Sequence, residues 1–292
     1  MLRTWKTALI FIAILLVPAR AWAQEEKGSK PFRDTVSAYR GKLPVDTSKP
    51  KVIGGKDAVW ADHKWQVGLL VSWIADPAEA QFCGGSIISK GWVLTAAHCV
   101  VNGTVADDVH ILSGTDNLSK GGARSNVDVI LVHKDYSLLT HENDVALLHV
   151  KGKLTGTAIE LAGESDDASV SSPAAGAKLT ISGWGKTETG LPSTQLKTAA
   201  IPLVSRKKCN SPPSYDGKIT EAMICAGRDE GGLDSCKGDS GGPGAADGKL
   251  AGVVSWGSGC AVPFKYGVYA NVAKLNKWIK GCITDVKSCP KM

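Results

Sequence analysis

Most of the chain after residue 52 is a succession of short apolar segments separated by turn residues. The segments are rich in Val, Ile, Leu and Trp, and Gly, Pro, Asn or Asp stand between them. They cover residues 65–73, 84–89, 92–99, 109–114, 127–133, 144–150, 178–185, 250–257 and 267–272. Short strands at this spacing are typical of barrels and sandwiches, so the pattern predicts an all-β fold.

One segment near the C-terminus follows a helical period instead. Val272, Leu275, Trp278 and Ile279 recur at spacings that place them close to one face of a helix. Residues 151–177 are small and polar with few periodic apolar positions, and we interpret them as a crossover between two halves of the fold. The sequence contains no internal repeat and no low-complexity segment.

The first 51 residues differ from the rest in composition and are not expected to belong to the folded domain. Two basic residues precede an apolar run of ten residues, 8–17, and an Ala-Trp-Ala pattern follows. These features predict a signal peptide over residues 1–23. The alternative is a membrane anchor, which the short run disfavours because spanning a bilayer takes about 20 apolar residues. Residues 24–51 are polar and lysine-rich, and such a segment buries little surface.

The basic charge of the chain belongs to this leader. The whole chain carries 34 Lys and Arg against 28 Asp and Glu, and residues 1–51 hold ten of the basic and four of the acidic residues. The remaining 241 residues therefore carry 24 charges of each sign and no net charge. We expect no affinity of this part for nucleic acid or for an anionic membrane. Its length is sufficient for one large core or two small ones.

All eight cysteines lie in the part of the chain after residue 82. They form no Cys-x-x-Cys pair, and no His-Glu-x-x-His pattern is present, so the sequence predicts no zinc site. An even number of cysteines in an exported chain indicates four disulfides. Spacing alone leaves their pairing open.

The stretch DSCKGDSGGP places Ser240 close to glycines, which allow a substrate backbone to approach it. Backbone N–H groups near Gly238, Asp239 and Ser240 are placed to converge on one point, as an oxyanion site requires. Serine is a weak nucleophile unless a base removes its proton. His98 in TAAHC is the candidate base, and Asp144, a lone acid that opens an apolar strand, is the candidate group that orients it.

Taken singly, these residues have ordinary explanations as a packed histidine, a turn aspartate and a glycine-rich turn. Together, the motifs VIGG, TAAHC, NDVALL, GWG, GDSGGP and SWG resemble the trypsin/chymotrypsin family of serine proteases in type and order. The resemblance covers residues 52 to about 283. It implies two antiparallel six-stranded β-barrels with the active site between them and a C-terminal α-helix. The implied protease domain is 52–292, with a first barrel over about 52–150 and a second barrel and helix over 178–292.

The resemblance also implies a role for each site residue. Ser240 attacks the scissile carbonyl, His98 acts as the base, and Asp144 orients the imidazole. The N–H groups of Gly238 and Ser240 bind the oxyanion. The residues implied to form the specificity pocket, S1, are Asp234, Ser235, Ser255, Trp256, Gly257 and Gly267. Asp234 at its base selects Arg or Lys before the scissile bond (P1), because an apolar side chain would leave a buried charge unpaired.

The motif KVIGG matches the activation site of the same family. The resemblance implies that residues 24–51 are an activation peptide that is removed by cleavage between Lys51 and Val52. The new α-amino group of Val52 would then pair with Asp239. Lys51 also suits the specificity implied by Asp234, so self-activation stays open.

The resemblance implies the disulfides Cys83–Cys99, Cys209–Cys225 and Cys236–Cys260. Cys282 and Cys289 lie outside the common set of the family, and we pair them by parity, with two free thiols as the alternative. The region of the family's calcium loop, residues 113–125, has no glutamate, and we expect no metal and no cofactor. Whether Tyr266 marks a sodium site, as a tyrosine there does in some relatives, stays open.

The leading hypothesis is a secreted or periplasmic trypsin-like endopeptidase, made as a zymogen, that acts as a monomer on polypeptides with Arg or Lys at P1. Protein protease inhibitors are the other expected partners, whereas nucleic acid and membranes are not. One alternative is an inactive homologue that works as a binding module, which the intact catalytic positions disfavour. Another is a protease with a single regulatory substrate. Sequence does not separate that alternative from the leading hypothesis, because loop contacts set extended specificity.

Overall fold

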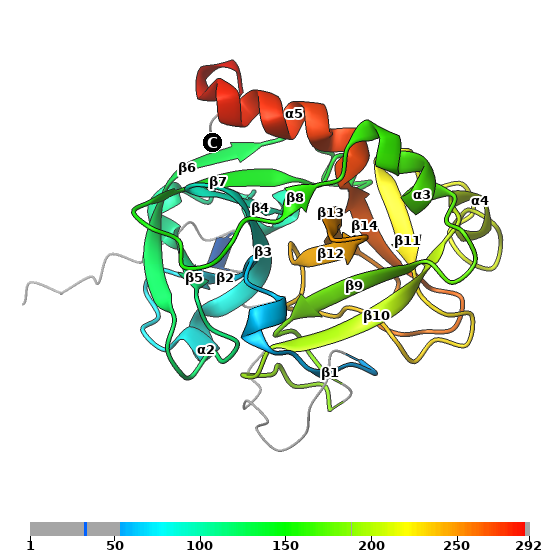
Figure 1. The fold of residues 1–292 in the computed structure, drawn as a ribbon, viewed down its shortest axis with the longest axis horizontal. Coiled ribbons are helices and arrows are strands. Elements are labelled where there is room, and N and C mark those ends of the chain that lie inside the picture. The colour runs from blue at the N-terminus through cyan, green and yellow to red at the C-terminus, as the bar shows by residue number, and fades with distance from the viewer. Residues whose placement is uncertain (1–31, 34–52, 188, 290–292) are drawn as a thin grey trace, which may run out of the picture.

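The computed structural model describes residues 32–33, 53–187 and 189–289 of the chain. The first half of the domain forms a closed antiparallel barrel of six strands (Figure 1). The strands are β2 (Gln66–Val71), β3 (Gln81–Ser89), β4 (Trp92–Thr95), β5 (Val109–Ser113), β6 (Ala123–Val132) and β7 (Ala146–Lys151). They are hydrogen-bonded in the order β2-β3-β4-β7-β6-β5, and β5 closes the ring by pairing with β2.

The second half forms another ring of six antiparallel strands. These are β9 (Lys178–Gly183), β10 (Lys197–Val204), β11 (Met223–Ala226), β12 (Pro243–Ala246), β13 (Lys249–Trp256) and β14 (Gly267–Asn271). β9 pairs with both β12 and β10 and so closes the order β10-β11-β14-β13-β12-β9. Two short strands attach to this ring, β1 (Lys56–Asp57) antiparallel to β10 and β8 (Glu160–Leu161) parallel to β13. The predicted fold class of two six-stranded antiparallel barrels is confirmed.

Two strands of the first barrel, β2 and β3, are buried on both faces. All six residues of β2 and the first eight of the nine in β3 are buried. A strand buried on both faces reads as an apolar run rather than as an alternation, which agrees with the apolar segments in the sequence. Packing here is close, because a Cβ added to Gly85 would lie 2.8 Å from Val93 Cγ1.

The helices are single turns, except for the last one. They are α2 (Pro77–Ala80), α3 (Asp167–Ser171), α4 (Arg206–Cys209), η1 (Trp60–Asp62), η2 (Ala97–Cys99), η3 (Ala106–Asp108), η4 (Glu164–Asp166) and η5 (Val286–Ser288). The predicted C-terminal helix is confirmed as α5 (Val272–Thr284), which lies across the top of the molecule in Figure 1. It contacts β13 of the second barrel, and its Trp278 ring lies 4.8 Å from the His133 ring of the first. No helix in the described ranges is long and apolar enough to span a membrane.

Several hydrogen bonds join the two barrels, and two of them involve β2 and β3. The Gly84 N–H in β3 donates to the Ser240 carbonyl at 2.7 Å. The Ser182 hydroxyl in β9 donates to Gln66 Oε1 in β2 at 2.6 Å, and both side chains are buried. The loop that carries Ser240 is therefore attached to the first barrel as well as to the second.

The predicted signal peptide and most of the predicted activation peptide lie outside the described residues. Of this leader the structure describes Phe32 and Arg33. The Phe32 side chain is fully buried, and its ring meets those of Trp73 and Phe82 edge to face at centroid distances of 5.9 and 5.5 Å. One aromatic residue of the leader thus packs into the core of the first barrel.

The eight cysteines form four disulfides, Cys83–Cys99, Cys209–Cys225, Cys236–Cys260 and Cys282–Cys289. The last one ties the end of α5 to the short tail that follows it. Its two cysteines are seven residues apart, so it closes the shortest loop of the four.

Replacing both Cys282 and Cys289 by alanine is expected to lower the free energy of unfolding by about 2–3 kcal/mol, because the unfolded chain then gains the freedom of the opened loop. Alanine is chosen because Cys282 is fully buried and serine would place a hydroxyl in the core. Urea unfolding of this variant and of its parent would measure the change, both in a Ser240→Ala background that prevents self-digestion. An unchanged midpoint would show that the tail disulfide does not stabilise the domain.

Candidate active site

A cavity of about 240 Å³ lies where the two halves of the domain meet, and both halves contribute to its wall. The predicted site residues on the wall are His98, Asp234, Ser235, Ser240, Ser255, Trp256, Gly257 and Gly267. Asp144, Gly238 and Asp239 do not line it, and Lys51 and Val52 lie outside the described residues. The predicted base, the predicted nucleophile and the predicted pocket aspartate therefore share one space.

Strand pairing in the first barrel brings His98 and Asp144 together. β4 pairs with β7 so that Thr95 faces Ala146, and His98 follows β4 on η2 while Asp144 precedes β7. The His98 Nδ1–H group donates to Asp144 Oδ2 at 2.7 Å, and the His98 backbone N–H donates to Oδ1 at 2.9 Å. A neutral imidazole that carries its proton on Nδ1 has an unprotonated Nε2 that can accept a proton.

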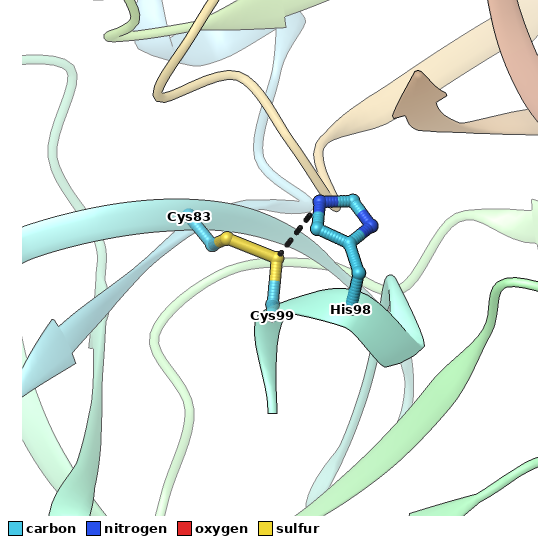
Figure 2. A group of neighbouring side chains, drawn as sticks. All are labelled: Cys83, His98 and Cys99. Carbon is cyan, nitrogen blue, oxygen red and sulfur yellow. Dashed lines mark hydrogen bonds between the residues drawn. A yellow bond between two sulfur atoms is a disulfide. The ribbon is translucent and has the colours of Figure 1, made fainter. Parts of the chain in front are cut away.

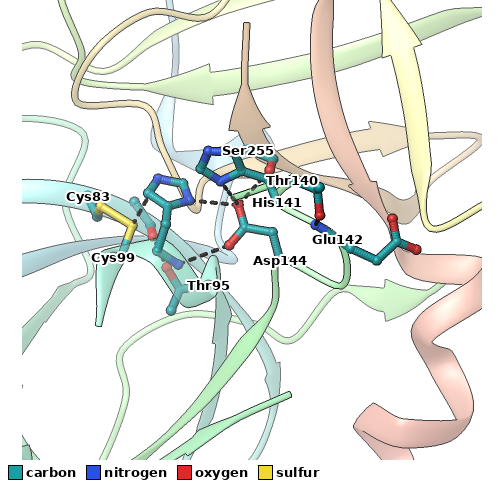
Figure 3. Close-up of polar contacts among 10 residues, drawn as sticks. Cys83, Thr95, Cys99, Thr140, His141, Glu142, Asp144 and Ser255 are labelled. Carbon is teal, nitrogen blue, oxygen red and sulfur yellow. Dashed lines mark hydrogen bonds and ion pairs between the residues drawn. A yellow bond between two sulfur atoms is a disulfide. The ribbon is translucent and has the colours of Figure 1, made fainter. Parts of the chain in front are cut away.

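Asp144 receives a third hydrogen bond from the second barrel. The Ser255 hydroxyl in β13 donates to Oδ2 at 2.5 Å, as Figure 3 shows. Asp144 is fully buried, and burial alone raises the pKa of its carboxyl group. The charge of His98 and the hydrogen bonds from His98 and Ser255 outweigh burial, so the net pKa lies below its usual value. Asp144 is therefore ionised at neutral pH and can stabilise a protonated imidazole.

A disulfide restrains the other edge of the imidazole. Cys99 follows His98 directly, and its Sγ atom lies 3.9 Å from His98 Nε2 (Figure 2). Because Cys99 is bonded to Cys83 in β3, the turn that carries the histidine is fixed to the neighbouring strand.

The loop before Ser240 is organised around the buried side chain of Asp239. Its Oδ1 accepts a hydrogen bond from the Gly185 N–H at 2.8 Å, and its Oδ2 accepts one from the Cys236 N–H at 2.9 Å. A Cβ at position 185 would lie 2.6 Å from Asp239 Cγ, so the carboxylate requires glycine there. Burial raises the pKa of Asp239 to about 6 in spite of these two hydrogen bonds.

Two backbone donors at and near Ser240 have no partner in the described part of the chain. The carbonyl of Gly238 accepts from Gln81 Nε2 at 2.9 Å, and the carbonyl of Ser240 accepts from Gly84. Gly238 has a φ of +100°, a conformation that favours glycine. Among the described residues, no acceptor pairs with the N–H of either Gly238 or Ser240. Such a pair of donors has the character of an oxyanion site.

Asp234 is buried at one end of the cavity. Its Oδ2 accepts a hydrogen bond from the Ala261 N–H at 2.9 Å, whereas Oδ1 is buried and has no hydrogen-bond partner among the described residues. A Cβ at position 267 would lie 2.6 Å from Oδ1, so the carboxylate requires glycine there, and both residues line the cavity. Burial raises the pKa of Asp234 to about 7. A cation would both pair with the unpartnered oxygen and hold the carboxylate in its ionised form.

The start of the domain packs against the Asp234 loop. The Asp234 N–H donates to the Ile53 carbonyl at 3.3 Å in an isolated bridge. Gly54 follows with a φ of +73°, and a Cβ there would lie 2.5 Å from the Gly232 carbonyl oxygen. Packing against this loop thus requires the first glycine of the VIGG motif, Gly54.

Sequence reasoning missed His141, which also lines the cavity. Its ring meets that of His98 edge to face at 5.8 Å and stacks on that of Trp256 at 6.3 Å. Its Nδ1 lies 3.9 Å from Asp144 Oδ2, and burial lowers the pKa of the His141 imidazole. The available signal was the position of this histidine three residues before Asp144.

Comparison with known proteins agrees with this geometry. A profile of the family described as Trypsin matches residues 52–279. The chain belongs to the trypsin family. Trypsin eta of Drosophila melanogaster is 42% identical to it over 242 residues, which are 80% of this chain and 88% of that protein. Trypsin 5G1 of Aedes aegypti is 36% identical over 277 residues, 94% of this chain and 98% of that protein. A trypsin of Saccharopolyspora erythraea is 40% identical over 223 residues, 76% of this chain and 93% of that protein.

These matches confirm the family resemblance read from the motifs. As a member of the trypsin family, the chain is a serine endopeptidase, a hydrolase whose substrates are polypeptides.

If Ser240 and His98 act as one unit, Ser240→Ala and His98→Ala should each lower kcat on a peptide substrate by at least about 10⁴-fold, and the double variant should be little worse. His149→Ala is the matched control, because His149 also pairs with a carboxylate, Asp128 at 2.6 Å, but both of these side chains are partly exposed and neither lines the cavity. Losses that multiply in the double variant would argue against a shared mechanism.

Proposed function

We propose that this trypsin-family protease cleaves polypeptides after Arg or Lys. The observation that carries the proposal is the buried Asp234 on the cavity wall, whose Oδ1 has no hydrogen-bond partner among the described residues. A guanidinium or ammonium group of a substrate would supply the missing donor and the opposite charge. An apolar side chain would leave the carboxylate unpaired in a buried site.

In the proposed mechanism Ser240 Oγ attacks the scissile carbonyl while His98 Nε2 takes its proton. Asp144 holds the imidazole in the required tautomer and stabilises its charged form. The N–H groups of Gly238 and Ser240 stabilise the oxyanion, and one such donor typically contributes about 3–4 kcal/mol. His98 then returns the proton to the leaving amine. Three side chains and two backbone groups thus account for acylation.

We also propose that the protease is made as a zymogen that is activated between Lys51 and Val52. Two observations support this: Ile53 lies against the Asp234 loop, and Asp239 is a buried carboxylate without a cation among the described residues. Pairing with a new α-amino group would offset the burial of Asp239 and hold the Gly238 and Ser240 donors in place. Lys51 fits the proposed P1 specificity, so the enzyme is a candidate for its own activation.

The proposal extends to location and partners. The leader supports secretion or export to a periplasm, and the disulfides fit an oxidising compartment. We propose a monomer whose partners are polypeptides with Arg or Lys at P1 and protein protease inhibitors. The observed contacts around His98 and Asp144 favour an active enzyme over an inactive binding module.

Profiling of a peptide library at P1 with the activated enzyme tests the specificity, with Asp234→Ser as the variant. The variant should lose at least about 10³-fold in kcat/KM on Arg and Lys substrates, because a buried cation loses its partner. Asp128→Ser, which removes an exposed aspartate, should leave the profile unchanged. Cleavage by the parent enzyme mainly after Phe, Leu or Ala would contradict the proposal.

The activation step is tested with Lys51→Gln. The variant is expected to remain uncleaved and nearly inactive, whereas N-terminal sequencing of the active parent should begin at Val52. The α-amino group has a reference pKa of about 8, and pairing with Asp239 raises it in the active form. The resulting stabilisation is complete below pH about 8 and is lost as pH rises through the raised pKa, so activity should fall at alkaline pH. Full activity of the uncleaved variant would reject this account.

A further inference from the structure

One residue of the leader is packed into the folded domain. The Phe32 side chain is fully buried, and its ring meets the rings of Trp73 and Phe82 edge to face at centroid distances of 5.9 and 5.5 Å. In Figure 1 the described residues of the leader are the dark-blue segment drawn at the first barrel. Edge-to-face ring pairs stabilise a contact beyond the area that they bury. Phe32 therefore marks a point at which the polar leader binds the domain.

The domain itself holds the two rings that receive Phe32. Arg124 in β6 donates from Nη1 to the Ile74 carbonyl at 2.7 Å and from Nη2 to the Val71 carbonyl at 2.6 Å. These hydrogen bonds fix the turn that carries Trp73 to the barrel. Phe82 is a fully buried residue of β3, which pairs with β2 on one side and with β4 on the other. The site for Phe32 is thus built from parts of the domain that do not need the leader to hold them.

The connection along the chain does not force Phe32 into this site. Phe32 precedes Val52 by 20 positions, and at about 3.3–3.6 Å for each residue such a segment spans up to about 66–72 Å. The 241 residues after Lys51 make a domain with a radius of gyration of about 18 Å. The segment is therefore long enough to reach any face of the domain, and the ring contacts select this one.

We propose that Phe32 anchors the leader to the first barrel, and that the leader stays bound as a separate chain after cleavage between Lys51 and Val52. This inference rests on the proposed activation step. Hydrolysis adds one water to one peptide bond, and the ring contacts of Phe32 involve neither residue of that bond. No cysteine precedes Cys83, so a disulfide cannot hold the leader, and its retention is noncovalent.

The leader then acts as a ligand of the domain that it leaves. Because it binds the folded domain and not the unfolded chain, it raises the stability of the folded state by mass action. β3, which carries Phe82, also reaches the nucleophile loop, since Gln81 Nε2 donates to the Gly238 carbonyl and the Gly84 N–H donates to the Ser240 carbonyl. A retained leader therefore stabilises the strand that supports the catalytic loop.

Retention is tested on the zymogen, residues 24–292, with Ser240→Ala to prevent self-digestion. Replacement of residues 47–50 by aspartate allows a protease specific for an acidic run before lysine to cut after Lys51 alone. Gel filtration without denaturant, followed by mass spectrometry of the domain peak, should find the leader fragment that ends at Lys51 together with the domain. A leader fragment that elutes apart from the domain would overturn the proposal.

The anchor is tested with variants on both sides of the contact. Phe32→Ala should raise the dissociation constant of the cut leader at least about tenfold, because a buried ring and its edge-to-face pairs are lost. Trp73→Ala, which changes the domain side, should have the same effect. Phe264→Ala is the matched control, because that ring is 41% exposed, and it should leave the affinity unchanged. Fluorescence anisotropy of a dye on the leader measures the constants, and equal values for the parent and Phe32→Ala would reject the anchor.

Urea unfolding provides a measurement that does not depend on separation of the chains. Before the cut, Phe32→Ala should lower the unfolding midpoint. After the cut, the midpoint of the parent should rise with protein concentration, because only a bound leader makes unfolding depend on concentration. A cut parent whose midpoint is independent of concentration would reject retention. Because the cut is imposed on an inactive chain, failure of the proposed activation step would show separately, as an active parent enzyme that does not begin at Val52.

Discussion

The buried carboxylate of Asp144 is the point at which the two barrels and the site depend on one another. Its donors come from both halves of the chain, namely the His98 backbone and ring in the first barrel and the Ser255 hydroxyl in the second. Loss of any of these donors would leave a buried charge less well satisfied, which is costly in a medium of low dielectric constant. The contacts that orient the imidazole therefore also join the two barrels. A shift of one barrel relative to the other would break the Ser255–Asp144 hydrogen bond and disturb the His98–Asp144 pair.

The three buried aspartates of the site differ in how completely they are satisfied. Asp144 has its donors within the folded chain, and its pKa is lowered. Asp239 and Asp234 are buried with fewer donors, and their pKa values are raised to about 6 and about 7. The proposed partners of these two are cations that arrive later, the α-amino group of Val52 and the side chain of the substrate. In the proposed mechanism, Asp239 is therefore the buried carboxylate that activation pairs with a cation, and Asp234 is the one that the substrate pairs with a cation.

Packing also decides which side chains surround the candidate base. The His141 ring contacts the rings of both His98 and Trp256 and lines the cavity with them. Ring packing thus decides that a second imidazole, that of His141, lies on the cavity wall beside His98.

The sequence by itself determined the strand-rich character of the chain, the C-terminal helix and the family, because these depend on local apolar patterns and on short motifs around His98, Asp144 and Ser240. Only the tertiary structure decided how the strands pair and how the site residues come together. His98 and Asp144 meet because Thr95 of β4 faces Ala146 of β7, and the second ring closes because β9 pairs on both its edges. His141 belongs to none of the motifs, and its contact with His98, which is far away in the sequence, exists only in the folded chain. Such pairings are set by the register of non-local strands and by side-chain packing, and neither leaves a periodic signal in the sequence.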